Sequence, residues 1–268
     1  MRARILAVST LIATALSWSL PAVAQDATGD VTVIHGFRGL TADVYLDGQL
    51  VLEGFTPERI TDPMALPAGA HDVRVYEAGA ATTETPVVAG SLDVTAGANI
   101  SAVVHAAQDG TPRLSAFVND TSQIPAGSVR LAVRHTAASG PIDVLLDGAP
   151  LVTGIANGTE STEQVSAAAH QVAVAAAGAA DPLIPPQDAE FPEGTVMSLY
   201  LVGSATDNSL SWLAQTIAGS AGAPSAVSTG NSGLAAPRQT GVPVALVAAS
   251  FGVFLVVAGR RRRAREHG

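Results

Sequence analysis

The sequence predicts an all-β protein, built as two tandem antiparallel β-sandwich domains followed by one C-terminal transmembrane helix. Three observations predict this fold class. A long internal repeat divides most of the chain into two similar halves. Each half consists of short β-branched segments separated by turn residues. An uncharged apolar run followed by arginines lies close to the C-terminus.

The internal repeat is marked by a six-residue motif that occurs twice, as DVYLDG at residues 43–48 and as DVLLDG at residues 143–148. The similarity continues to LSAF at residues 114–117, which aligns with LSWL at residues 210–213 with an offset of 96. The offset thus drifts by only four residues over a whole half, and loops can absorb that drift. A duplicated motif alone would not extend so far. We therefore expect two duplicated domains, over residues 30–125 and 127–218.

Each half is expected to contain about seven short strands. Segments such as DVYL, HDVRVYE and NISAVVHA alternate or run apolar, and they are rich in β-branched residues. The segment SAAAHQVAVAAAGAA has a high helix propensity of its own. Its alignment with HDVRVYE nevertheless favours a strand. Short strands at short intervals, without a sustained helical period, are typical of a sandwich.

Asp47-Gly48 and Asp147-Gly148 are predicted to be hairpin turns. Asp-Gly between two apolar segments is a preferred pair for a two-residue type I′ turn, because both central residues need positive φ. The alternative is a calcium loop built on Asp43 and Asp47. Such loops use a closely spaced run of oxygen ligands, which this segment lacks. The repeated phrase is therefore interpreted as architecture.

Four histidines recur in the two halves: His35, His71, His135 and His170. The two-residue period of a strand places them in phase with apolar residues, at the ends of rows that face the core. One interpretation is a two-imidazole metal or ligand site in each domain. Metal sites usually need third and fourth ligands, and none stands at a fixed spacing. We expect these side chains to tie loop carbonyls to the core, and we assign no metal, cofactor or catalytic residue.

The N-terminus is predicted to be a signal peptide over residues 1–24. Arg2 and Arg4 precede an apolar core that ends in the small residues Ala-Val-Ala. This is the three-part pattern of a secretory signal, with cleavage between Ala24 and Gln25. The protein is therefore expected to be exported.

The C-terminal region is predicted to be an anchor. Residues 219–241 are rich in Gly, Ala, Ser, Pro and Thr, which is typical of a flexible stalk. Residues 242–258 are uncharged and apolar, at the short end of what spans a bilayer. Residues 259–268 contain five arginines, which predicts a basic tail on the cytoplasmic side.

Thr240 and Gly241 stand directly before this span, and the arrangement resembles the cell-wall sorting signals of Gram-positive bacteria. The resemblance implies cleavage by a sortase between Thr240 and Gly241. The sequence departs from the Leu-Pro-any-Thr-Gly pattern, since Pro237-Arg238-Gln239 precede the pair. A retained single-span anchor and a cleaved sorting signal therefore both stay open.

Composition restricts the partners and the chemistry. The chain has no cysteine, which excludes disulfides and thiolate metal sites. Residues 25–241 carry seven Arg against twenty-two dispersed Asp and Glu, a charge that disfavours nucleic acid. No nucleophile elbow, phosphate loop, zinc-helix motif or dinucleotide fingerprint occurs in the sequence. No cofactor is expected.

The order of segments resembles a known family. A Val-rich strand, DVYLDG, LPAGAHDVRVYEAG and LDVTAGANISAVVH follow one another as in the bacterial extracellular family called domain of unknown function 4397. A fainter resemblance connects them to PEGA surface domains. The resemblance covers both halves and implies a secreted, often tandem, immunoglobulin-like or transthyretin-like sandwich. It implies no established activity and supplies no functional residues.

These observations together predict a non-catalytic protein at the extracellular face of the membrane or in the cell wall, with an adhesive, structural or ligand-presenting role. Its expected partners are the membrane, through the C-terminal helix, and an envelope polymer or surface protein. One alternative is a small-ligand or metal-binding module that uses the shared histidines. A second is an envelope hydrolase, which would require a carboxylate pair in a cleft. The sequence does not indicate which oligomeric state the protein adopts.

Overall fold

The computed structural model describes residues 27–219, and these form sixteen β-strands without a helix. The all-β prediction is confirmed for this part of the chain. Within the same range, no helix is long and apolar enough to cross a bilayer. The predicted signal peptide, the stalk beyond Gly219, the transmembrane helix and the basic tail lie outside the described residues.

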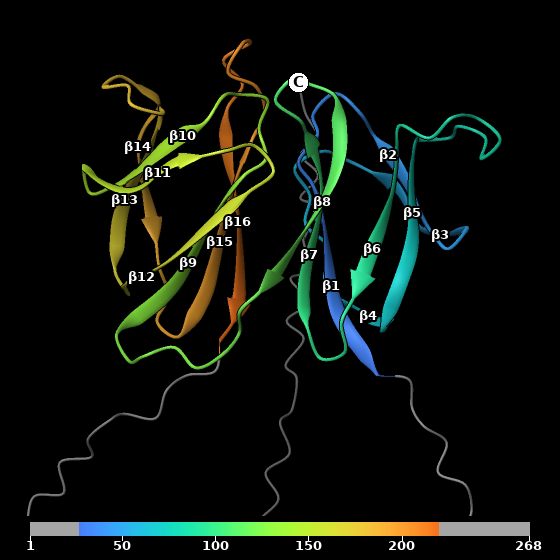
Figure 1. Cartoon of the computed structure of the whole chain (residues 1–268), viewed down its shortest axis with the longest axis horizontal. Coiled ribbons are helices and arrows are strands. Elements are labelled where there is room, and N and C mark those ends of the chain that lie inside the picture. Colours follow the sequence, from blue (N-terminus) through green and yellow to red (C-terminus); the bar gives the residue numbers. More distant parts are fainter. Residues whose placement is uncertain (1–26, 220–268) are drawn as a thin grey trace, which may run out of the picture. The chain divides into compact units, whose positions relative to one another are not determined.

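The first eight strands form two four-stranded sheets, ordered β4-β1-β7-β8 and β3-β2-β5-β6, which we call the first sandwich (Figure 1). Their bounds are β1 (Thr28–His35), β2 (Ala42–Leu46), β3 (Gln49–Phe55), β4 (Met64–Pro67), β5 (Gly69–Glu77), β6 (Val88–Val94), β7 (Asn99–Ala106) and β8 (Pro112–Asn119).

The last eight strands form sheets in the corresponding orders, β12-β9-β15-β16 and β11-β10-β13-β14, which we call the second sandwich. The Ala-rich segment contains strand β13 and no helix. The bounds are β9 (Ser128–His135), β10 (Ile142–Leu146), β11 (Ala149–Ile155), β12 (Glu160–Ser166), β13 (Ala169–Ala176), β14 (Pro182–Glu190), β15 (Thr195–Val202) and β16 (Ser211–Ala218).

The predicted antiparallel pairing is wrong at one pair of strands in each sandwich. β1 pairs with β7 in parallel, and β9 pairs with β15 in parallel. The chain leaves β1 for the opposite sheet and returns before it forms β7, so the two neighbours run in the same direction. Alternation along a strand is the same beside a parallel or an antiparallel neighbour, so the sequence pattern could not distinguish them.

The predicted alignment of LSAF with LSWL is also displaced. Leu114 pairs with Val104, and Trp212 pairs with Leu201 at the corresponding place in the second sandwich. The equivalent residues are thus Leu114 and Trp212, at an offset of 98 in place of 96. A shift by two residues keeps every side chain on its own face of the sheet, so the pattern of alternation tolerated the error.

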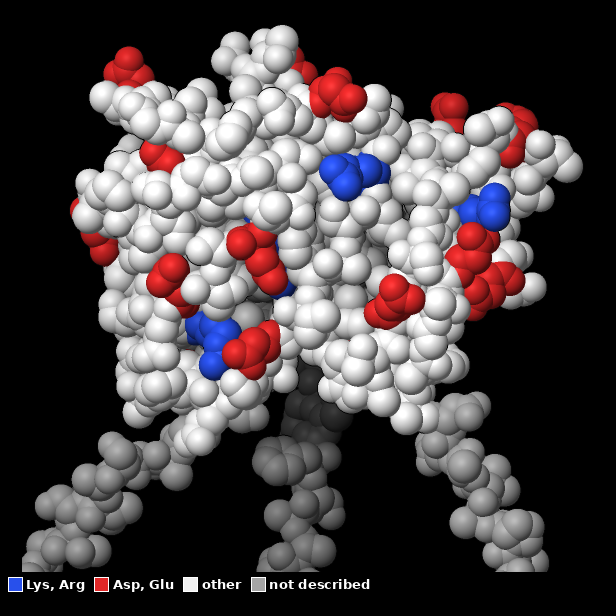
Figure 2. Space-filling model, in the orientation of Figure 1, with Lys and Arg blue, Asp and Glu red and all other residues white. Residues whose placement is uncertain are grey.

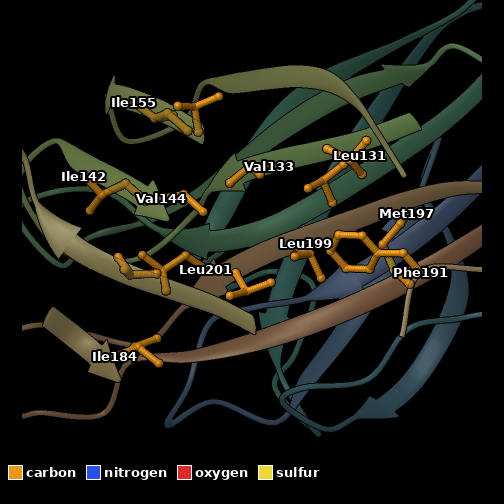
Figure 3. Close-up of a cluster of buried hydrophobic side chains, with 14 of the residues drawn as sticks. Leu131, Val133, Ile142, Val144, Ile155, Ile184, Phe191, Met197, Leu199 and Leu201 are labelled. Carbon is orange, nitrogen blue, oxygen red and sulfur yellow. The ribbon is translucent and has the colours of Figure 1, made fainter. Parts of the chain in front are cut away.

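Each sandwich has its own apolar core between its two sheets. Val31, Val75 and Ile100 belong to the core of the first sandwich. Figure 3 shows the second core, where Leu131 and Leu199 point into the space between the sheets. Full burial of such a side chain stabilises the fold by about 1.5–3 kcal/mol.

A third apolar cluster joins the two sandwiches. Ile34, Val103 and Phe117 of the first pack against Tyr200 and Val202 of the second. The sheets that contain the parallel pairs are therefore covered on both faces. This explains why seven of the eight residues of β7, and likewise of β15, are buried, as parallel strands usually are.

Candidate functional site

The repeated Asp-Gly pairs lie in the tight connections between β2 and β3 and between β10 and β11. The φ angles are 51° and 77° at Asp47 and Gly48, and 52° and 80° at Asp147 and Gly148. Both residues of each pair have the positive φ that a type I′ turn requires.

Asp47 has a second role that the sequence analysis missed. Its Oδ2 lies 2.7 Å from Nδ1 of His71, and its Oδ1 accepts a hydrogen bond from the amide of Asp72 at 2.9 Å. His71 Nε2 lies 2.8 Å from the carbonyl oxygen of Pro67. The hydrogen bond with Asp47, supported by the Pro67 carbonyl, raises the pKa of His71. The turn of one hairpin is therefore tied to the start of β5.

The second sandwich contains the same contact between an aspartate of a hairpin turn and a histidine of a neighbouring strand, and we call this contact the clasp in both sandwiches. His170 Nδ1 lies 2.6 Å from Asp147 Oδ2, and its Nε2 lies 3.0 Å from the carbonyl oxygen of Ser166. The hydrogen bond with Asp147 raises the pKa of His170. The sequence did carry a signal for this contact, because the aspartate and the histidine both recur in the two halves.

The other repeated aspartate, Asp43, holds two backbone turns. Its Oδ1 accepts from the amide of Gly54 at 2.7 Å and its Oδ2 from the amide of Gly79 at 2.9 Å. Both glycines have positive φ. Asp143 binds the two equivalent glycine amides in the second sandwich. These carboxylates serve the architecture of the loops, and Asp43 and Asp47 are both engaged in hydrogen bonds within the protein.

The remaining shared histidines, His35 and His135, are buried inside the sandwiches. His135 Nε2 lies 2.9 Å from the carbonyl oxygen of Gly140. The ring nitrogens of His35 have no hydrogen-bond partner among the described residues, and the ring packs 5.4 Å from that of Phe55. Burial lowers the pKa of both histidines. Within residues 27–219, no group of three or more His, Cys, Asp or Glu side chains could hold a metal ion.

The interface between the sandwiches is centred on a buried arginine. Arg134 is 1% exposed, and it donates to Glu160 at 2.9 Å, to the Tyr200 hydroxyl at 2.5 Å and to Asn119 at 2.6 Å. Its guanidinium also lies 4.7 Å from the ring centroid of Phe117. Because Asn119 and Phe117 belong to the first sandwich, this one side chain connects the two.

Further side chains join the sandwiches at the end where β1, β7, β9 and β15 finish, which we call the loop end. The Asn157 amide donates to the carbonyl oxygens of Ala106 at 2.9 Å and Ala137 at 2.7 Å. Arg38 of the first sandwich donates to the Ser211 hydroxyl of the second at 2.6 Å. β1 begins and β16 ends at the opposite end of the sandwiches (Figure 1).

An open groove of about 570 Å³ lies between the two sandwiches at the loop end. We call it the loop-end groove. Arg113 of β8 is exposed, and its side chain has no hydrogen-bonded or ion-pair partner among the described residues. Figure 2 shows acidic side chains scattered over the visible face, with few basic ones among them. The residues lining the groove are Ala107, Gln108, Asp109, Arg113, Ala156 and Asn157.

The fold and this groove define a class: an all-β sandwich protein with an open, polar-lined groove between loops at one end. Residues 29–145, less than half of the chain, match the family described as Domain of unknown function (DUF4397). The resemblance seen in the sequence is thus confirmed for residues 29–145. The match spans the first sandwich and continues into β10. No curated protein matches the chain.

Proposed function

We propose that this protein is a non-catalytic surface module of a bacterial envelope that presents its loop end to an envelope polymer or a surface protein. The observation that carries the proposal is the position of the chain's exit from the sandwiches relative to the groove. The end of β16, which leads to the C-terminal region, lies opposite the loop-end groove. A flexible stalk attached at the end of β16 would leave the groove at the far end accessible.

The joint between the sandwiches supports a presenting role. Arg134, Asn157 and Arg38 each form hydrogen bonds from one sandwich to the other. These bonds and the apolar cluster around Phe117 hold both walls of the groove at a fixed spacing. A preorganised surface loses little conformational freedom on binding, which favours affinity.

The chemistry of the groove favours a polar partner. The guanidinium of Arg113 presents donors that suit carboxylate or phosphate groups and hydroxyls. The amide of Gln108 adds a further donor and acceptor beside it. The immunoglobulin-like or transthyretin-like character of the sandwiches, the signal peptide and the C-terminal helix are parts of the same proposal, supported by the sequence pattern.

The anchor is tested by deleting residues 242–268. The full chain is expected in the cell-envelope fraction and the shortened chain in the medium. The intact mass of the mature protein then separates a C-terminus at Thr240, left by sorting, from one at Gly268, left by a retained span. Recovery of the full chain in the cytoplasm with residues 1–24 attached would refute the topology.

Binding is tested with the released chain on isolated cell envelopes. Arg113→Ala is expected to weaken retention about two- to fivefold, the effect of one exposed ionic contact. Arg74→Ala is the matched control, since Arg74 is also exposed but is paired with Asp72. An equal loss in both variants would show a general charge effect and contradict the proposed role of the groove.

A further inference from the structure

The joint between the two sandwiches is linked covalently at one end only. β8 ends at Asn119 and β9 begins at Ser128, so residues 120–127 connect the sandwiches at the end opposite the loop end (Figure 1). At the loop end, the contacts between the described residues of the two sandwiches are all noncovalent. The joint can therefore open at the loop end, with residues 120–127 as the pivot.

His105 of β7 lies in the joint, close to the loop end. It is in phase with Val103, which belongs to the apolar cluster between the sandwiches, whereas Val104 faces the first core. The side chain of His105 is 0% exposed. Its Nδ1 lies 2.9 Å from the carbonyl oxygen of Ala106, and the same oxygen accepts the amide of Asn157 at 2.9 Å. The imidazole thus shares an acceptor with a hydrogen bond that crosses the joint.

The contacts of His105 fit a neutral imidazole. A ring nitrogen that faces a carbonyl oxygen must donate, so Nδ1 carries the proton. Nε2 lies 2.9 Å from the hydroxyl of Ser115, which can donate to it. Both partners are uncharged, so neither would balance a positive charge on the ring.

The charged groups that face His105 oppose its protonation. Arg113 of β8 is directly opposite His105 in the register, and its charge repels a charged imidazole. His135 of the second sandwich adds repulsion of the same sign when it is charged. The nearby backbone of Thr136, also in the second sandwich, is neutral. Protonation would therefore bury a positive charge between like charges.

No acidic side chain among residues 27–219 forms an ion pair with His105. A counter-charge is thus missing while the joint stays closed. The acidic side chains at the joint are engaged with other groups: Asp109 with Thr111, Glu58 with Arg38, and Glu160 with Arg134.

We propose that protonation of His105 opens the joint at the loop end, so that the loop-end groove widens in acid. Water reaches the ring in the open form, which removes the cost of burying the charge. Burial lowers the pKa of His105 from 6.5 to about 4 in the closed form. The closed form therefore keeps its full stability above pH 6.5, and the ratio of open to closed molecules should rise about 300-fold as the pH falls to 4. The inference holds whether or not the groove binds the partner proposed above.

The distance across the loop-end groove measures this opening. The chain has no cysteine, so Gln108→Cys in the first sandwich and Ala156→Cys in the second each accept one spin label. Both positions are exposed and line the groove. Pulsed electron paramagnetic resonance of the full chain is expected to give one short distance at pH 7 and a longer one that grows as the pH falls to 4. An unchanged distance at pH 4, or a change that accompanies loss of the strand signal in circular dichroism, would overturn the proposal.

Two variants remove the titrating group. His105→Val introduces the residue type of the second sandwich, where Val202 holds the equivalent position. His105→Gln keeps hydrogen-bonding atoms and serves if the apolar side chain disturbs the fold. Both variants are expected to keep the short distance at pH 4. A longer distance that still grows with the pH midpoint of the parent would contradict a role of His105.

Two controls test other titrating groups. His35→Gln changes a histidine that is also buried but packs against Phe55 of the first core, and it should leave the acid response of the distance unchanged. Glu160→Gln imitates protonation of the acid that pairs with Arg134, and it should keep the short distance at pH 7. Opening of Glu160→Gln at pH 7, or a loss of response in His35→Gln as complete as in His105→Gln, would assign the effect to other groups and refute the proposal.

Discussion

The two sandwiches share one strand order but use equivalent positions differently. Ile34 is an apolar contact at the interface, whereas Arg134, its counterpart, is the centre of a hydrogen-bond network. Leu92 closes an edge that Ala189 leaves open. The comparison teaches that the topology and the aspartate–histidine contacts are shared, and that the differences lie at the joint between the sandwiches and along one edge.

The largest expected effect comes from Arg134→Ala. It would leave Glu160, Asn119 and the Tyr200 hydroxyl without their buried partner. The charge left on Glu160 is exposed, so the cost comes from the cavity and from the unsatisfied Asn119 oxygen, about 3–5 kcal/mol for so large a buried side chain. Urea unfolding of the full chain should show this loss. A cost below about 1 kcal/mol would mean that the network adds little to the joint between the sandwiches.

Exchanging the residues at the two edges should have opposite effects. Leu92→Ala removes a buried leucine from the first core and is expected to lower the free energy of unfolding by about 2–5 kcal/mol. Ala189→Leu fills space and is expected to change it by no more than about 1 kcal/mol, or to raise it. Thermal and denaturant unfolding of both variants gives the comparison, and equal costs would show that the edges are alike.

Buried histidines and histidines paired with an aspartate should change the stability with pH in opposite directions. Burial lowers the pKa of His105 to about 4. Its contribution to the free energy of unfolding is therefore fully present above pH 6.5 and is lost as the pH falls towards 4, because the unfolded chain binds the proton first. The pKa of His71 and His170 is raised, so the stability from the clasps is present below 6.5 and is lost as the pH rises through the folded-state value.

Changing His71 and His170 to Gln isolates the second dependence. The double variant should melt at a lower temperature than the parent at pH 5 and lose less stability between pH 6 and 8. Melting curves across this range measure the difference. If the purified variant also lost stoichiometric zinc or copper that the parent retained in equilibrium dialysis, the clasps would be metal ligands and the structural interpretation would fail.

The smallest effect is expected at the hairpin turns. Gly48→Ala and Gly148→Ala place a Cβ at φ angles of 77° and 80°, with nothing within 4 Å of it. The cost is therefore backbone strain alone, about 1 kcal/mol in each sandwich. Urea midpoints of the two variants should shift by similar amounts. Unequal shifts would show that the two turns are constrained differently.

The sequence by itself determined the all-β class, the family resemblance of residues 29–145 and the positive φ of the two Asp-Gly turns. These properties are local. Alternation with period two identifies strands, and Asp-Gly between strands identifies a turn, without knowledge of what lies opposite. Asp47 and His71 both recur in the second half, and this recurrence was a signal for the contact between them, although the contact was not predicted.

Only the tertiary structure decided the parallel pairs, the interface and a cavity of about 250 Å³ between β14 and β16. Period-two alternation is blind to the direction of the neighbouring strand and to a shift by two residues. The interface includes Arg134, Ser101 and Gln215, polar types that a strand normally turns to solvent, so their burial could not be read from their pattern. This cavity arises because Ala189 and Trp212, which lie on different sheets, fail to fill one space, and that depends on packing in three dimensions.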